Sequence, residues 1–224
     1  MRNTVFAAGF VVSAPFAASA ATFDFEGFAP GTTINSVSDG GVTASITVTP
    51  NGNGLPAAQI FDTANPGSNA DGDPDLGIPF VDAVTGAAFA NPGNVLIVQE
   101  DPNADGGLDT NPDDAGDGGI IEFVFDQVVN ILSFEVFDDV TNFTVTTDVA
   151  GQTETVNIGE DNEALLVLLN FDGVQTLTFD FGNASGAIDN ITFEVPAIPL
   201  PAGMPLLLAG LAGLGYMSRR RRNV

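Results

Sequence analysis

Short segments of apolar or alternating residues recur from residue 21 onward, between turns rich in Gly, Asn and Asp. Residues 42–49 and 176–181 alternate between apolar and polar side chains, as strands with one buried face do. The pairs Asp172-Gly173 and Ala150-Gly151 fall where tight hairpin turns would be needed. We predict strands at 22–27, 42–49, 57–61, 94–99, 119–126, 131–138, 142–148, 152–158, 164–169, 174–181 and 187–195.

These segments predict an all-β fold. No part of the region has the apolar stripe of an amphipathic helix, and numerous short strands without a fixed repeat favour a single antiparallel jelly-roll-like β-sandwich. The apolar segment Leu165–Leu169 fits a buried strand or a helical turn, and we predict a strand. Residues 62–93 and 100–118 are rich in Asp, Asn, Gly and Pro, and we predict two long acidic loops there.

The two ends of the chain have the pattern of targeting segments. Arg2 precedes the apolar run Val5–Ala18, and the small residues Ala18 and Ala20 fit a cleavage site, so we predict a signal peptide over 1–20. A first core helix is the alternative. Near the C-terminus an apolar run is followed by a cluster of basic residues that would stay on the cytoplasmic side: Arg219, Arg220, Arg221 and Arg222. The run is shorter than the ~20 residues of a usual membrane span, so we predict a temporary anchor.

The C-terminal segment has three parts in a fixed order, which are a short Pro-containing motif, an apolar helix and the Arg cluster. The motif consists of Ile198, Pro199, Leu200, Pro201 and Ala202. The order resembles the PEP-CTERM class of sorting signals, and most closely the VPLPA-CTERM variant of Gram-negative bacteria, with Ile198 in place of Val. A plain single-pass anchor is the alternative.

The resemblance implies a route through the cell. It implies export by the signal peptide, transient anchoring in the inner membrane, and recognition of the tail by an exosortase-type sorting protease. Release to the cell surface or the extracellular matrix would follow. The chain is thus divided into a signal peptide at 1–20, a β-sandwich ectodomain at 21–197 and a sorting signal at 198–224.

The charge of the chain excludes several functions. Among 224 residues, 29 are Asp or Glu, five are Lys or Arg, and there is no His or Cys. This composition excludes His-dependent nucleophiles, ordinary zinc sites and disulfides, and it argues against binding nucleic acid. All the basic residues lie in the two end segments, so 21–198 holds every acid and no base. Its carboxylates must be solvated, hydrogen-bonded or neutralised by cations.

Two acidic loop segments have the spacing of calcium ligands. In the first, Pro112 stands where an EF-hand needs Glu, which excludes an EF-hand, although Asp113 and Asp114 could supply further oxygens. The second has three acids at alternate positions, which cannot all stay ionised in a loop without a cation or full hydration. The candidate ligands are Asp101, Asn103, Asp105 and Asp109 in the first segment, and Asp62, Asp71, Asp73 and Asp75 in the second. A solvated acidic surface is the alternative for both.

A third candidate site joins the first and last predicted strands. Glu26 follows the first strand's Asp24 and Phe25, and Asp189 lies in the last strand. The terminal strands of a jelly roll are commonly neighbours, so Glu26 and Asp189 could face each other. The pair resembles the structural calcium site of carbohydrate-binding-module jelly rolls, and this resemblance implies Glu26 and Asp189 as ligands. The alternative is that both side chains point to solvent.

Three functions follow from these patterns. The first is a non-enzymatic, calcium-stabilised protein of the cell surface or exopolysaccharide matrix. The second is a carbohydrate-binding module that recognises a glycan directly. The chain has no Trp and its only Tyr lies in the tail, so Phe80 and Phe89 would have to stack on the sugar. The third is a carboxylate glycosidase, for which the number of acids gives no discrimination.

Overall fold

The computed structural model describes residues 19–52, 54–67, 74–100, 113–138, 140–197, 209–215 and residue 219. Residues Ser19–Pro196 form one compact unit, and the fold described below is that of this unit. Outside it, residues 209–215 and residue 219 are helical. Among the described residues, no helix is both long and apolar enough to cross a membrane. The predicted motif at 198–202 lies outside the described residues, as do Ala18 and three of the four C-terminal arginines.

The unit is all-β, as the hydrophobic pattern predicts. Its strands are β1 (Ala20–Phe23), β2 (Thr33–Ile34), β3 (Ser36–Asp39), β4 (Val42–Pro50), β5 (Gly54–Asp62), β6 (Val81–Asp82), β7 (Asn94–Glu100), β8 (Gly119–Phe137), β9 (Phe143–Thr147), β10 (Thr153–Val156), β11 (Glu163–Asp180) and β12 (Ala187–Glu194). Hydrogen bonds link them in the order β10-β9-β11-β8-β12-β7-β5-β2. In addition, β1 pairs with β12, and β4 pairs with both β3 and β8. Every pairing is antiparallel except that of β6 with β11.

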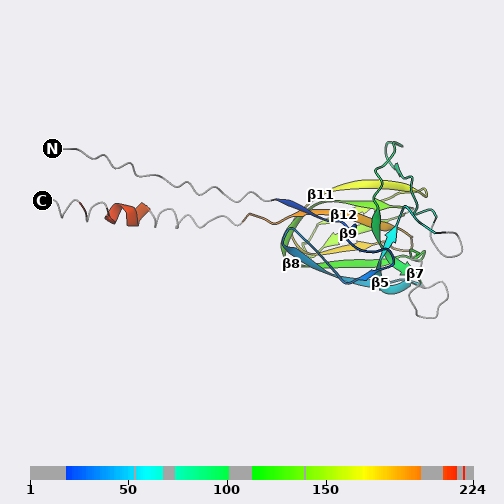
Figure 1. Cartoon of the computed structure of the whole chain (residues 1–224), viewed down its shortest axis with the longest axis horizontal. Helices are drawn as coiled ribbons and strands as arrows, with labels where there is room; N and C mark the ends of the chain where they lie inside the picture. The colour runs from blue at the N-terminus through cyan, green and yellow to red at the C-terminus, as the bar shows by residue number, and fades with distance from the viewer. Residues whose placement is uncertain are drawn as a thin grey trace. The chain divides into compact units, whose positions relative to one another are not determined.

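The two long strands β8 and β11 are neighbours in the middle of this order, and both are labelled in Figure 1. On its side away from β11, β8 changes neighbour, because residues 119–125 pair with β4 and residues 130–137 pair with β12. The β8–β11 ladder shifts register at three places between Leu168 and Thr176. Such bulges bend a strand and allow one strand to serve two layers of a fold.

One predicted hairpin turn is wrong. Asp172-Gly173 lies inside β11 rather than between two strands, and Gly173 has a φ of 75°. A glycine in this left-handed conformation serves a bulge as readily as a turn, so the dipeptide alone does not distinguish the two. The neighbouring prediction of a strand at Leu165–Leu169 is confirmed, because the segment belongs to β11.

Phenylalanines fill the interior, and the largest fully buried side chains are all Phe. Phe179 lies among three other rings of the main cluster, with its ring centroid 5.1 Å from that of Phe134. A second, smaller cluster lies on the other face of β7. There Val95 and Ile97 belong to the small cluster, whereas Leu96 and Val98 belong to the main one. Both faces of β7 are therefore buried, which explains its unbroken apolar sequence.

Candidate cation site

The pairing of β1 with β12 brings the predicted residues Glu26 and Asp189 into one region. The ladder runs from Ala20 opposite Glu194 to Phe23 opposite Ile191. Beyond it, Phe25 stays buried in the main cluster while Asp24 and Glu26 are exposed. This alternation points the two carboxylates away from the core, on the segment that follows β1.

Asp189 is the unusual member of this region. Its side chain is only 1% exposed, and neither Oδ1 nor Oδ2 has a hydrogen-bond partner. In the β12–β8 ladder Asp189 lies directly opposite Glu135. Side chains opposite each other in an antiparallel pair share a face, with Cβ atoms about 4.5–5.5 Å apart. Two carboxylates therefore lie side by side, and the unit has no positively charged side chain that could neutralise them.

The pKa of Asp189 reflects the same repulsion between buried carboxylates. Burial first, and then the negative charges of Glu135, Glu26 and Asp24, raise the pKa of Asp189 to about 8, although the nearby backbone N–H of Asn190 acts to lower it. Burial disfavours an ionised carboxylate, and nearby like charges do the same. At neutral pH this side chain requires either a proton or a cation.

Glu26 is fixed in position by the start of β7. Its Oε1 accepts a hydrogen bond from the backbone N–H of Asn94 at 2.7 Å. The Asn94 side chain in turn donates to the carbonyl of Phe28 at 3.0 Å. Gly93 has a φ of 76°, and a Cβ at this position would lie 2.1 Å from Glu26 Oε1. The Glu26 carboxylate thus ties the loop after β1 to β7, next to a backbone conformation at Gly93 that favours glycine.

Glu135 is oriented by an irregularity in β12. Its Oε2 accepts a hydrogen bond from the side-chain amide of Asn190 at 2.9 Å. Asn190 has a φ of 50° and lies at the register shift between Asp189 and Thr192. The sequence pattern does not reveal Glu135, because its only local signal is an acid between the apolar Phe134 and Val136. Its relevance depends on the register with β12, which no pattern within one strand reveals.

The arrangement is not a completed metal cage. In the part of the chain that the structure describes, no three acidic side chains converge as a metal-binding group. Glu26 and Glu135 each direct one oxygen toward an amide instead. Asp189 nevertheless offers two buried oxygens with no hydrogen-bond partner, which is the donor type that a hard cation takes. The residues therefore fit a calcium ion through Asp189, with the other carboxylates around it.

The acidic loop residues have a different outcome. Asp71, Asp73, Asp101, Asn103, Asp105 and Asp109 lie outside the described residues. Asp62 bonds within its own turn, accepting from the N–H of Ala64 at 2.9 Å and the amide of Asn65 at 2.6 Å. Asp75 lies near Asp113, whose pKa is raised to about 6 by burial first, then by Glu100 and by Asp75.

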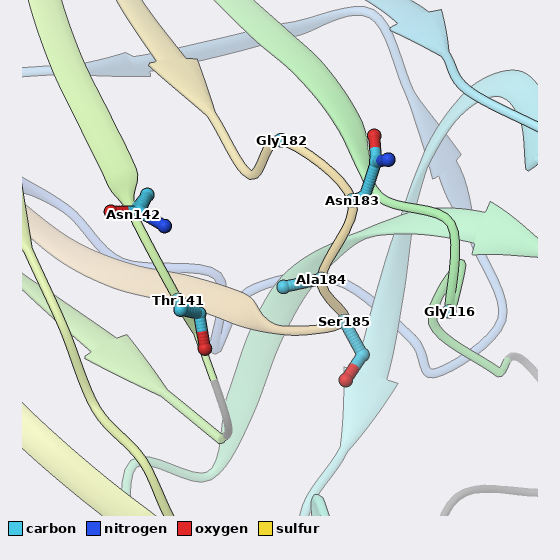
Figure 2. A pocket seen from close by; sticks show the side chains of 7 residues that line it. All are labelled: Gly116, Thr141, Asn142, Gly182, Asn183, Ala184 and Ser185. Carbon is cyan, nitrogen blue, oxygen red and sulfur yellow. The ribbon is translucent and has the colours of Figure 1, made fainter.

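A surface pocket of about 600 Å³ lies elsewhere on the unit. Figure 2 shows Thr141 and Asn142 on one side of it and Asn183 and Ser185 on the other. The complete lining is Gly116, Thr141, Asn142, Gly182, Asn183, Ala184 and Ser185. Its amides and hydroxyls form a polar lining without an aromatic ring.

The two phenylalanines proposed to stack on a sugar are not arranged for it. Phe80 is 1% exposed and packs on Phe137 with ring centroids 5.1 Å apart. Phe89 is partly buried and meets the same Phe137 ring edge-on at 5.8 Å. A ring that stacks on sugar needs one open face, so these rings serve the small cluster instead.

Neither a scan against protein-family models nor a search of curated proteins finds a match to this chain.

Proposed function

We propose that this chain is an exported, non-enzymatic protein of the cell surface or exopolysaccharide matrix whose β-sandwich is held together by calcium. The observation that carries the proposal is Asp189, which buries two oxygens without a hydrogen-bond partner opposite Glu135. The unit has no basic side chain between residues 21 and 198 that could neutralise them.

Export and sorting are supported by the sequence, through the pattern at 1–20 and the tripartite segment 198–224. A jelly-roll arrangement is supported by two features of the topology. The first and last strands are neighbours, and β8 changes partner from β4 to β12 along its length. A transient sorting protease and a matrix glycan are the partners that this route implies.

A calcium ion would supply the positive charge that the buried carboxylates lack. Asp189 would hold it, with Glu135, Glu26 and Asp24 around it. Because these residues come from β12, β8 and the segment after β1, binding would tie three parts of the chain together. Extracellular calcium modules bind with dissociation constants of about 10⁻⁴–10⁻³ M. At ten to a hundred times that concentration, one ion stabilises a fold by about 1.4–2.7 kcal/mol.

Thermal melting of the full chain at fixed ionic strength tests this function. Calcium at millimolar concentration should raise Tm by about 3–10 °C over chelator, and magnesium should have a smaller effect. Asp189→Asn should lose the calcium increment, and its Tm in chelator should rise because a neutral amide avoids burying a charge. The exposed Asp161→Asn is the control and should behave as wild type. Equal effects of calcium, magnesium and sodium chloride would reject the calcium proposal.

Direct glycan binding is a second candidate, supported by the polar pocket alone. Amide and hydroxyl groups of Asn142, Asn183 and Ser185 could hydrogen-bond a sugar. A glycan array probed with the full chain tests this function. Binding that disappears in Asn142→Ala and Asn183→Ala would support it, and an array without signal would reject it.

A further inference from the structure

Four polar residues lie on neighbouring segments at strand ends, outside the region of Asp189 described above. Gln99 is the next-to-last residue of β7, and Asp114 forms an isolated bridge with it. Asp138 directly follows β8, and Ser185 lies two residues before β12. Three of the four, Gln99, Asp114 and Asp138, are among the few buried polar residues of the unit.

Gln99 provides the observation that points to a ligand. Its side chain is 0% exposed, and its Nε2 donates to the carbonyl of Glu100 at 2.9 Å. That hydrogen bond fixes which end of the amide is nitrogen, because a carbonyl cannot accept from an oxygen without a proton. The other end, Oε1, is buried without a hydrogen-bond partner. Since Gln99 and Asp114 are directly opposite, their side chains share one face.

The two aspartates converge on consecutive residues. Oδ2 of Asp114 accepts a hydrogen bond from the N–H of Gly186. Oδ2 of Asp138 accepts one from the hydroxyl of Ser185 at 3.0 Å. Asp114 is 5% exposed and Asp138 is 2% exposed, so two carboxylates are buried near each other. Burying two like charges is costly unless a counter-charge accompanies them, and no base exists between residues 21 and 198.

Solvent has a route to this cluster. Ser185 lines the surface pocket together with Gly116, which follows Asp114 by two residues (Figure 2). Asp138 itself has a φ of 76°, a conformation uncommon for residues other than glycine, and it is therefore held there by its surroundings. An ion could reach the Ser185 side of the cluster from the pocket without unfolding of the sheet.

We propose that Gln99, Asp114, Asp138 and Ser185 form a second calcium site, separate from that of Asp189. All the donors are oxygens, and the set mixes carboxylates with an amide and a hydroxyl, which suits a hard cation of flexible coordination. The two sites differ in their position relative to β12. Asp189 faces Glu135 within the ladder, whereas this site lies just before Ala187, the first residue of β12.

Calorimetric titration of the full chain with calcium chloride tests the second site. We expect wild type to bind at least two ions, and Gln99→Leu and Asp138→Asn each to lose or weaken one of them at least tenfold. Asp189→Asn should remove the other ion, and Asp161→Asn should bind as wild type. Gln99→Leu should still fold, so a loss of calcium binding in this variant can be interpreted. Removing a buried acceptor that has no hydrogen bond should leave Tm in chelator unchanged or higher.

The outcomes separate this inference from the proposed function. Loss of an ion in Gln99→Leu but not in Asp189→Asn would support the second site and reject the first. Loss in Asp189→Asn, with wild-type stoichiometry and affinity in Gln99→Leu and Asp138→Asn, would overturn the second site alone. A Gln99→Leu variant that binds calcium normally but melts lower in chelator would also overturn it, since the glutamine would then serve the fold only.

Discussion

Asp189 and Glu135 lie directly opposite each other in the β12–β8 ladder, although they are 54 positions apart in the sequence. Such a like-charged cross-strand pair is destabilising by itself. A cation that takes up the charge would make the pair tolerable, so under the proposed function this is the place in the sheet where the fold would depend most on the metal.

Glu135→Gln should separate the two roles of this side chain. Glutamine keeps an oxygen that can accept from Asn190, so the local hydrogen bond survives. We expect Tm in chelator to rise by a few degrees because one of two facing charges is gone, and calcium affinity to fall about tenfold. Melting curves and calorimetry measure both quantities. A fall of Tm in chelator would show that the charge repulsion is not what limits the calcium-free fold.

Gly93→Ala should displace the side chain of Glu26, which is far from Gly93 in the sequence but close to it in space. The added Cβ would lie 2.1 Å from Glu26 Oε1, and alanine is also strained at a φ of 76°. Gly151→Ala is a matched control, because Gly151 has a φ of 85° but nothing within 4 Å. We expect both variants to lose about 1–2 kcal/mol of unfolding free energy from backbone strain. Only Gly93→Ala should lose more than this and bind calcium more weakly, and equal calcium titrations would contradict the role given to Glu26.

Asp148→Ala should destabilise the protein in a pH-dependent way. The N–H groups of Thr176 and Gln175 both donate to Asp148 Oδ1 at 3.0 Å and hold the pKa of this carboxyl below its usual range. The folded-state pKa is below the unfolded one, so the stabilisation is present above about pH 4 and is lost as pH falls through the folded value. We expect a deficit of about 1 kcal/mol at pH 7 that disappears near pH 2.

Urea denaturation at the two pH values measures the effect of Asp148→Ala. The control is Asp161→Ala, at an exposed position for which no deficit is expected. A deficit that is the same at both pH values would mean that the side chain acts through packing rather than through its charge.

Phe179→Ala should cost about 3–5 kcal/mol of unfolding free energy, because it empties a site among Phe134, Phe123 and Phe143. Leu168, in the same strand, is 74% exposed, and Leu168→Ala should change the stability by less than about 0.5 kcal/mol. Chemical denaturation of both variants tests the assignment. Similar losses would show that the exposed face of β11 is covered in solution.

Alternation was enough to predict most of β4 and β12, because burial dictates one face of each. For β7 the signal was its unbroken apolar sequence, because both of its faces are buried. The sequence pattern gave a wrong prediction where a strand bends without reversing its direction. Asp172-Gly173 has the composition of a hairpin turn, but β11 continues through it, because Phe171 and Val174 on either side stay paired with β8. Whether a glycine makes a turn or a bulge is decided by those partners and not by the dipeptide.

Only part of the candidate site was predictable from the sequence. Glu26 and Asp189 could be proposed because terminal strands of a sandwich tend to be neighbours. Glu135 could not, since only the register of β8 with β12 places it opposite Asp189. Phe80 was proposed to contact a sugar and is instead buried, because its loop folds onto Phe137 and closes the small cluster. Loop residues gain their surroundings from tertiary contacts that local composition does not encode.

The pairing of Ala20 with Glu194 also determines how the unit responds to mechanical force. Both ends leave from the same end of one antiparallel ladder, so pulling them apart peels β1 from β12 one rung at a time. Peeling requires less force than shearing a whole ladder at once. The last rung is Phe23 opposite Ile191, and Asp24 and Asp189 lie one and two residues beyond it. An ion bound there would resist further separation of the two strands. Calcium would therefore set the unfolding force that a tethered molecule withstands.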